Sequence, residues 1–273
     1  MSARGRETSS VEAPIGIFDS GIGGLTVAQQ ILTLLPREHL IYLGDTARTP
    51  YGTRSAETVR RYALEGAAFF AERNVKMIVI ACNTVSSTSM PALRERLTVP
   101  VIDVIEPGAR RAVQQTRNRK VGVIGTEATI RSGAYTRALR ELAPDLEIFT
   151  RACPLFVPLA EEGWVDNDVA LATAQSYLTS LRRSGIDTLV LGCTHYPLLA
   201  GVIGRAMGDG VTLVDSARTT AEVLAETLAS SGLARGTGEG SISFFVTDEP
   251  DRFIKVGARF MGQKVESAVR IER

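Results

Sequence analysis

The sequence of 273 residues has few of the residues on which several protein classes depend. Its three cysteines, Cys82, Cys153 and Cys193, form no CxxC pair, and its two histidines are His39 and His195. An odd and sparse set of cysteines excludes a disulfide framework, and so few cysteines and histidines argue against a zinc site. We therefore expect reduced thiols and a cytoplasmic protein.

Long apolar runs and an excess of one charge are also absent. The longest apolar runs, such as 77–82, are about a third of the roughly 20 residues that a membrane span needs. Lys and Arg total 31 and Asp and Glu total 30, a net charge of +1, which argues against a dedicated nucleic-acid-binding protein. The polar segment 1–12 lacks the apolar region of a secretory signal, so we expect a disordered tail there.

What the sequence does contain is typical of a globular α/β protein. Short runs rich in valine and isoleucine alternate with longer segments of helical period, of which 53–73 is the longest. This alternation predicts βα units around mostly parallel sheets. The predicted strands are 14–18, 40–43, 77–81, 101–104, 121–124, 146–150, 188–191, 212–214 and 242–246.

Two pairs of these strand ends resemble each other. Residues 76–84 read KMIVIACNT, and DTLVLGCTH begins 111 residues later at 187. IGIFDSG at 15–21 is followed 106 residues later by VGVIGTE at 121–127. Two pairs in the same order and at similar offsets indicate an internal duplication. We therefore predict two pseudo-symmetric α/β domains with parallel sheets and an active site in the cleft between them.

The duplication also predicts the domain boundaries. The first domain is expected to comprise 13–106 and 217–273, and the second 107–216. No Gly/Ser-rich linker separates them, so the two domains should pack closely.

Polar residues follow the strands at the sheet edge where open α/β sheets bind ligands. Cys82 and Cys193 each end a buried strand at equivalent places in the repeat, before a helix whose N-terminus lowers a thiol pKa from about 8.5. Two thiols in mirror-related domains suit proton transfer at a stereocentre, where one removes a proton and the other delivers one to the opposite face. Asp19 and His195 are placed to assist them. Cys153 has no counterpart in the repeat, so we expect it to be buried and inert.

Simpler readings of these residues stay open. A lone cysteine often packs as a small apolar side chain, Asp19 is also a favoured helix cap, and His195 could pack at a helix start. The glycines of DSGIGG at 19–24 lack the G-x-G-x-x-G spacing and the phosphate-loop lysine. They indicate a tight turn with exposed N–H groups that suits a carboxylate better than a nucleotide.

Longer motifs extend over most of the chain. In order they are FDSGIGG (18–24), GDTARTPYG (44–52), ACNT (81–84), VGVIGTEATI (121–130), CPLFVPLAEEG (153–163) and GCTHYP (192–197). Together they resemble the glutamate racemases, isomerases that interconvert L- and D-glutamate without a cofactor or metal and supply D-glutamate for peptidoglycan, and thus for cell wall biogenesis and cell shape. The resemblance implies a two-base mechanism in which Cys82 works on D-glutamate and Cys193 on L-glutamate.

The resemblance also implies roles for other residues. Besides the two cysteines, the implied catalytic residues are Asp19, His195, Glu161 and Asp45. The implied substrate-binding residues are Asp19, Ser20, Pro50, Tyr51, Gly52, Asn83, Thr84, Thr126, Thr129, Thr194 and His195. The expected partners are glutamate and a second copy in a homodimer, with no membrane and no nucleic acid.

Three other functions remain open. An aspartate or hydantoin racemase would use the same two thiols, although GDTARTPYG and the paired ACNT and GCTHYP motifs favour glutamate. A binding protein with an inactive site is disfavoured because Cys82, Cys193, Asp19 and His195 are all present. A thiol oxidoreductase is disfavoured because thiols on opposite faces of a substrate should be too far apart to form a disulfide.

Overall fold

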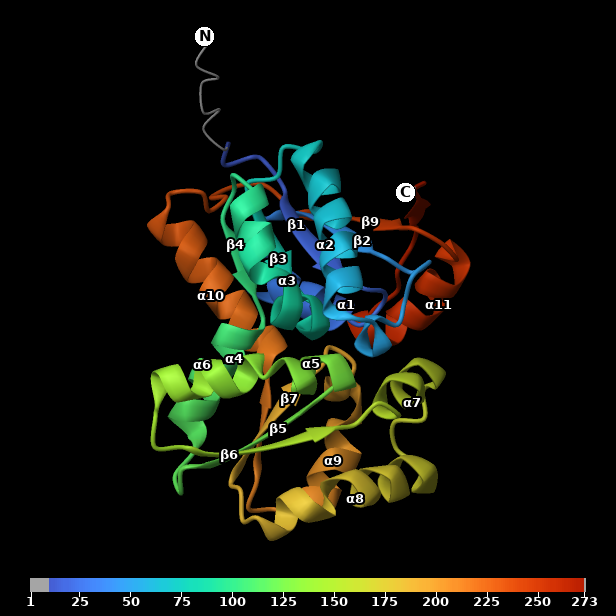
Figure 1. Cartoon of the computed structure of the whole chain (residues 1–273). Helices are drawn as coiled ribbons and strands as arrows, with labels where there is room; N and C mark the ends of the chain where they lie inside the picture. Colours follow the sequence, from blue (N-terminus) through green and yellow to red (C-terminus); the bar gives the residue numbers. More distant parts are fainter. Residues whose placement is uncertain (1–9, 273) are drawn as a thin grey trace.

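The computed structural model describes residues 10–272. Two parallel sheets lie one above the other, each covered by helices (Figure 1). The first sheet has the order β10-β9-β2-β1-β3-β4, and the second has the order β6-β5-β7-β8. The strands are β1 (Ile15–Asp19), β2 (His39–Gly44), β3 (Met77–Ile80), β4 (Val101–Asp103), β5 (Lys120–Gly125), β6 (Glu147–Ala152), β7 (Thr188–Gly192), β8 (Thr212–Asp215), β9 (Ser241–Val246) and β10 (Val269–Arg270).

At least one helix connects each strand to the next, as the crossovers of a parallel sheet require. Among residues 10–272, none of the helices is both long enough and apolar enough to cross a membrane. The helices are α1 (Leu25–Leu34), α2 (Ala56–Ala71), α3 (Asn83–Arg96), α4 (Ile105–Gln115), α5 (Glu127–Ser132), α6 (Ala134–Leu142), α7 (Phe156–Glu162), α8 (Asp168–Arg183), α9 (Ala200–Met207), α10 (Ser216–Ser230) and α11 (Pro250–Met261), with short 3₁₀ helices at Tyr51–Thr53 and Tyr196–Leu199.

All nine predicted strands are present, with bounds that differ by at most two residues. The predicted helix 53–73 is α2, which begins later because the hydroxyl of Ser55 caps it by accepting from the backbone N–H of Thr58. Strand β10 was not predicted. It has two exposed residues that pair only with β9 at the sheet edge, so it carries no alternating pattern.

The internal duplication is visible in the strand order. In the first sheet β1 lies between β2 and β3, with β4 beyond β3, and in the second sheet β5 lies between β6 and β7, with β8 beyond β7. Strands β1 and β5, and strands β3 and β7, are the pairs whose sequences match. The predicted fold class, an α/β protein with two related parallel-sheet domains, is therefore confirmed.

Alternate side chains of the first sheet enter two separate cores, as the period of two in a strand requires. Ile15 and Ile17 of β1 pack in a core that includes residues of α1, α10 and α11. Phe18 faces the other side and packs with residues of α2 and α3. Helices on both faces explain why β1 and β3 are buried along their whole length rather than half-exposed.

Helices near the predicted boundaries connect the two domains. Helix α4 packs on α6 and β7 of the second domain, whereas α10 contacts both α4 and α1. The boundaries near 106 and 217 stay predictions, because both lie at the start of these bridging helices.

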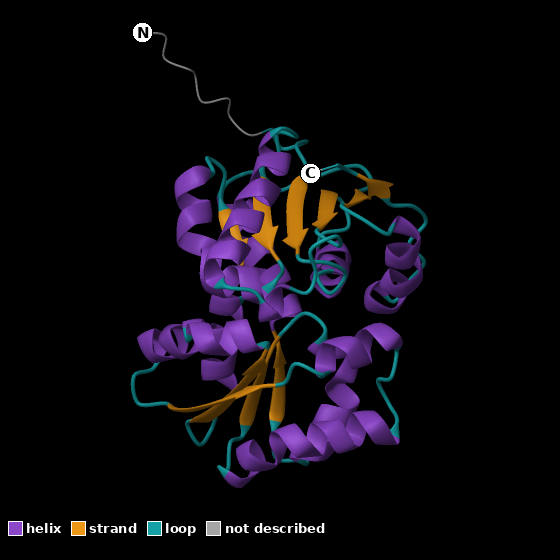
Figure 2. Ribbon diagram, turned by 45° about the vertical axis from the view of Figure 1, so that its right-hand side comes forward, coloured by secondary structure: helices purple, strands orange, loops and turns teal. Residues whose placement is uncertain are grey.

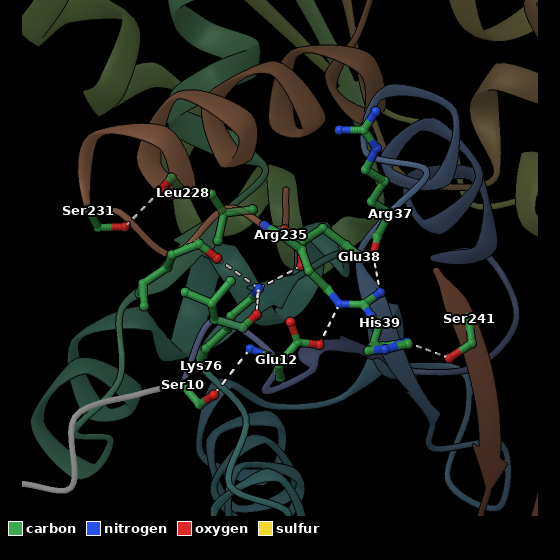
Figure 3. Close-up of polar contacts among 12 residues, drawn as sticks. Ser10, Glu12, Arg37, Glu38, His39, Lys76, Leu228, Ser231, Arg235 and Ser241 are labelled. Atoms are coloured by element: carbon green, nitrogen blue, oxygen red, sulfur yellow. Dashed lines mark hydrogen bonds and ion pairs between the residues drawn. The ribbon is translucent and has the colours of Figure 1, made fainter. Parts of the chain in front are cut away.

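A buried lysine directly before β3 holds distant segments together (Figure 3). Lys76, directly before β3, forms a 2.6 Å ion pair with Glu38, and the side chains of both are almost fully buried. Its ammonium also donates to the carbonyl oxygens of Val11 at 2.7 Å and Leu233 at 2.8 Å. The lysine therefore joins the start of the described chain to the connection between α10 and β9.

The predicted tail needs a partial correction. Residues 1–9 lie outside the described residues, but 10–12 do not fray from the domain. The carbonyl of Val11 accepts from the buried lysine, and Glu12 forms a 2.7 Å ion pair with Arg235 (Figure 3). Sequence reasoning missed this because both partners come from remote parts of the chain.

Candidate active site

A small cavity lies between the two domains, where the carboxyl ends of their strands meet. In Figure 2 the strand arrows of the upper sheet point toward the lower domain. The volume of the cavity is about 30 Å³, far below the several hundred Å³ of common small-molecule sites. Its walls are Ser20, Thr49, Pro50, Tyr51, Gly52, Cys82, Asn83, Thr84, Thr126, Val157, Cys193, Thr194 and His195.

Cys82 follows β3 and directly precedes α3, as predicted, at the N-cap position but without a side-chain capping hydrogen bond. The residue is 5% exposed, and its thiol donates to the hydroxyl of Ser20, with 3.3 Å between Sγ and Oγ. Burial, together with the nearby charge of Asp19, raises the pKa of Cys82 to about 12. The expectation of a lowered pKa is therefore wrong for Cys82, because loss of water outweighs the backbone N–H of Val85 at the helix start.

Cys193 follows β7 at the equivalent place, but a 3₁₀ turn rather than an α-helix comes next. Its Sγ lies 3.8 Å from Nδ1 of His195, and Nε2 of the same imidazole lies 3.1 Å from Oε1 of Glu161. Burial alone would lower the pKa of His195, but the hydrogen bonds to Cys193 and Glu161 outweigh it and raise the pKa to about 10. The arrangement therefore favours an imidazolium beside the second sulfur.

Asp19 ends β1 just outside the cavity wall and is 1% exposed. Its Oδ2 accepts from the backbone N–H of Gly21 at 2.9 Å, so the aspartate turns the chain as well as facing the site. Its Oδ1 has no hydrogen-bond partner among the described residues. Burial raises the pKa of this carboxyl, and the charge of His195 and the N–H groups of the turn partly offset the rise.

Neutral hydrogen-bonding groups line the remaining wall. Asn83 uses Oδ1 to accept from the hydroxyl of Tyr135 at 2.7 Å, which leaves its buried Nδ2 without a partner among the described residues. The hydroxyls of Thr84 and Thr126 lie 3.0 Å apart, and that of Thr129 lies 3.0 Å from Thr126. Thr129 thus stands behind the wall and orients the two threonines that form it.

Asp45 also lies behind the wall, and its carboxylate is fully engaged. It accepts from the hydroxyl of Tyr51, from Nε of Arg48 at 2.7 Å and from the hydroxyl of Thr247 at 2.8 Å. Burial and the charge of Asp45 raise the pKa of Tyr51, so its hydroxyl keeps its proton and donates to the carboxylate. Asp45 therefore fixes the loop that carries Pro50, Tyr51 and Gly52.

Three glycines allow close packing around the cavity, Gly23 and Gly52 against the second domain and Gly24 within the first. A Cβ on Gly23 would lie 2.3 Å from Oγ1 of Thr194 and 2.4 Å from Nδ1 of His195. A Cβ on Gly24 would lie 2.5 Å from the Cβ of Asp19, and one on Gly52 would lie 2.8 Å from Thr126. The run at 19–24 thus forms the predicted tight turn, and its lack of side chains lets the first domain contact the second.

Comparison with known proteins assigns the chain to a family. The sequence signature described as Asp/Glu/Hydantoin racemase matches residues 15–224. The chain belongs to this family. The glutamate racemase of Geobacter metallireducens is 59% identical over 252 residues, which cover 92% of this chain and 93% of that protein. The resemblance inferred from the motifs, and with it the prediction of a racemase, is confirmed.

Two solved structures of the same family are similar over almost the whole chain. The glutamate racemase isoform RacE1 of Bacillus anthracis has a TM-score of 0.92 and 39% identity, and covers 95% of this chain and 97% of its own. The glutamate racemase of Francisella tularensis in complex with D-glutamate has a TM-score of 0.91 and 37% identity, with 96% and 98% covered.

The fold brings the predicted site residues into one region, but in two layers. Eleven of them line the cavity, and Asp19, Asp45, Thr129 and Glu161 stand behind the lining residues. Sequence reasoning missed two residues of the wall, Thr49 and Val157. Thr49 lies inside GDTARTPYG and Val157 inside CPLFVPLAEEG, so these two motifs were the signal that could have identified them as residues of the wall. Cys153 is fully buried, as predicted, and its sulfur lies 3.8 Å from the carbonyl oxygen of Arg151.

Proposed function

We propose that this chain racemises glutamate without a cofactor, and that Cys82 and Cys193 act on opposite faces of the α-carbon. The observation that carries the proposal is the pair of thiols at equivalent strand ends of two duplicated domains, both lining one cavity. Glutamate is chosen because the relatives that cover almost the whole chain are glutamate racemases, one of them in complex with D-glutamate.

The surroundings of the two sulfurs suggest different roles. Cys193, whose Sγ lies 3.8 Å from Nδ1 of a histidine that favours its charged form, is proposed to act as the thiolate base toward L-glutamate, and Cys82, whose pKa is raised, as the thiol acid. The thiolate would take the α-proton of L-glutamate, so that the C–H bond breaks, an S–H bond forms and the electron pair remains on carbon. The thiol of Cys82 would then deliver its proton to the opposite face, giving D-glutamate and a Cys82 thiolate.

The reverse reaction uses the same groups with exchanged roles. The Cys82 thiolate would deprotonate D-glutamate, and the Cys193 thiol would protonate the carbanion. Between turnovers with L-glutamate, the Cys193 thiol would release its proton to solvent and the Cys82 thiolate would take one from solvent, and the charged imidazole of His195 beside Cys193 would favour this return.

The carbanion must be stabilised by hydrogen bonds in a site that excludes water. The unpartnered Nδ2 of Asn83 is a buried donor that a substrate carboxylate could accept from. The hydroxyls of Thr84, Thr126 and Thr194 are proposed as further donors. The unpartnered Oδ1 of Asp19 is an acceptor suited to the substrate ammonium group, which would also offset the burial of this carboxyl.

The small cavity implies that the domains part to admit substrate. A volume of about 30 Å³ is far below the several hundred Å³ of common small-molecule sites, so glutamate needs more room. We propose that the domains close around the substrate, which would expel water and bring both thiols to the α-carbon.

Proton exchange with solvent tests the proposal directly. The purified protein is incubated with L-glutamate in heavy water without added cofactor, and the α-proton is followed by NMR and the optical activity by circular dichroism. Loss of both signals is expected. Exchange of the α-proton without loss of optical activity would show that the proton is removed and returned on one face of the α-carbon only. That result would contradict the two-thiol mechanism. If the protein left glutamate unchanged but exchanged the α-proton of aspartate or a hydantoin, that compound would be the substrate instead of glutamate.

We also propose a place for this reaction in the cell. D-Glutamate made by a cytoplasmic homodimer would supply peptidoglycan synthesis. Growth of a strain depleted of this protein should be restored by added D-glutamate, provided that the strain takes it up. Sedimentation of the purified protein tests the homodimer, and a monomer at all concentrations would contradict it.

A further inference from the structure

Helix α11 reaches from the first domain to the histidine side of the site. It follows β9 of the first sheet, but it lies above α7 of the second domain (Figure 1). A guanidinium nitrogen of Arg252 lies 2.9 Å from Oε2 of Glu161, and one of Arg259 donates to the backbone carbonyl of the same residue at 2.9 Å. The two arginines are seven residues apart, or about two helical turns, so they present one face of α11 to α7.

Glu161 divides its carboxylate between two partners. Oε1 faces Nε2 of His195 at 3.1 Å, and Oε2 faces Arg252. Because each oxygen has its own donor, the carboxylate cannot rotate without losing one of them. Burial alone would raise the pKa of Glu161, but its contacts with His195 and Arg252 outweigh it and lower the pKa.

His195 is enclosed by groups from several elements. The charged or titratable groups that face it are Cys193, Asp19 and Glu161, and Phe260 of α11 places its ring edge-on at 5.2 Å between centroids. Of the charges on α11, those of Arg252 and Arg259 reach the histidine only through Glu161. Helix α11 therefore acts on the imidazole by packing and through one carboxylate.

We propose that Arg252 is a positioning residue for the Cys193 half of the reaction. By holding Glu161, it keeps the imidazole of His195 oriented toward the second sulfur. This inference rests on the proposed racemase function. It predicts that loss of Arg252 slows proton transfer at Cys193 and leaves proton transfer at Cys82 unchanged.

Isotope effects can separate the two transfers although steady-state rates cannot. The enantiomers have equal free energies, so any variant must change kcat/KM equally in both directions. A slower Cys193 step, however, becomes more rate-limiting in both directions. The α-deuterium isotope effect on kcat/KM should then rise with deuterated L-glutamate, whose bond breaks in that step, and fall toward 1 with deuterated D-glutamate, whose bond breaks in the other.

The experiment compares wild type with Arg252→Gln, Arg252→Lys and Lys255→Gln. Lys255 is an exposed cation on the same helix and has no contact with Glu161 among the described residues. Arg252→Gln should lower kcat/KM at least threefold, within the roughly 100-fold that a 1 Å misplacement can cost, and should shift the two isotope effects in opposite directions. Arg252→Lys should restore most of the rate, and Lys255→Gln should match wild type.

Two different results would overturn the inference. Unchanged isotope effects in Arg252→Gln, with or without a lower rate, would mean that Arg252 only supports the structure. Equal changes in Lys255→Gln would mean that net charge on α11 matters rather than the contact with Glu161. A wild-type protein that does not exchange the α-proton of glutamate would instead remove the proposed function and, with it, this inference. Thermal unfolding of each variant checks folding, which half-exposed Arg252 should not disturb.

Discussion

At the scale of single residues, the duplicated cysteines have diverged in their surroundings. Cys82 donates to a neutral hydroxyl and lies near the carboxylate of Asp19, whereas Cys193 contacts an imidazole backed by Glu161. Both cysteines are buried. The fold places the two cysteines equivalently, but their electrostatic surroundings differ. This difference would make one of them the acid and the other the base in the same enzyme, as a two-base reaction requires.

Replacing each cysteine by alanine tests their assignment. Cys82→Ala and Cys193→Ala should each abolish racemisation in both directions, because the removed proton and the delivered proton need different groups. Cys153→Ala is the matched control, since this thiol is buried away from the cavity. It should retain nearly full turnover and lose about 1–2 kcal/mol of unfolding free energy. Initial rates by circular dichroism with each enantiomer give the comparison, and full activity in either of the first two variants would contradict the two-thiol mechanism.

The raised pKa of Cys82 also predicts a pH dependence of stability. The unfolded thiol loses its proton near pH 9, whereas the folded thiol keeps it to about pH 12. Above pH 9 the folded state therefore binds more protons than the unfolded state, and the free energy of unfolding falls by about 1.4 kcal/mol per pH unit from this group. Below pH 9 its stabilising contribution is fully present.

Urea unfolding of wild type and Cys82→Ala between pH 8 and pH 10.5 measures this contribution. The difference between the two proteins should stay constant up to about pH 9. Above pH 9 the free energy of unfolding of wild type should fall relative to that of Cys82→Ala, by about 2 kcal/mol at pH 10.5. Parallel stability curves over the whole range would show that the thiol ionises equally in both states.

At the scale of elements, the turn from β1 to α1 sets how closely the domains can approach. Gly23→Ala would place a methyl group 2.3 Å from Thr194 and 2.4 Å from His195. The histidine must then move, and we expect turnover to fall about 100-fold, as misplacements of about 1 Å do. Gly201→Ala on α9 is the control, because nothing lies within 4 Å of its added carbon. Steady-state rates and thermal unfolding of both variants test this, and a fully active Gly23→Ala would mean that the contact is not needed.

Sequence reasoning succeeded where the information is local. Buried apolar runs marked β1, β3 and β7, and the polar residues that follow them identified most of the cavity wall. It failed where a contact joins remote segments. Arg252 is 91 residues from Glu161, and neither its residue type nor its place on an exposed helix face distinguishes it from the other arginines. The pKa of Cys82 was misjudged for the same reason, because burial depends on the whole fold.

At the scale of the whole molecule, the buried lysine Lys76, paired with Glu38, ties the start of the described chain to the connection between α10 and β9. Lys76→Met would leave a buried carboxylate without its cation, which costs about 3–5 kcal/mol in unfolding free energy. Adding Glu38→Gln should recover part of the loss, because the amide oxygen can still accept from the backbone N–H of Arg235. Urea midpoints of the single and double variants measure this, and a Lys76→Met protein as stable as wild type would contradict the assignment.

Closure of the two domains is the whole-molecule step that we propose for catalysis. Cys82 and Cys193 are 5% and 6% exposed and share a cavity of about 30 Å³, so an alkylating reagent can reach them only when the domains part. In a Cys153→Ala background these are the two remaining cysteines of the chain. Glutamate at ten times its dissociation constant should slow their alkylation about tenfold, because only the unbound fraction stays reactive. Aspartate at the same concentration is the control. Equal labelling rates with and without glutamate would mean that the substrate does not close the domains over the thiols.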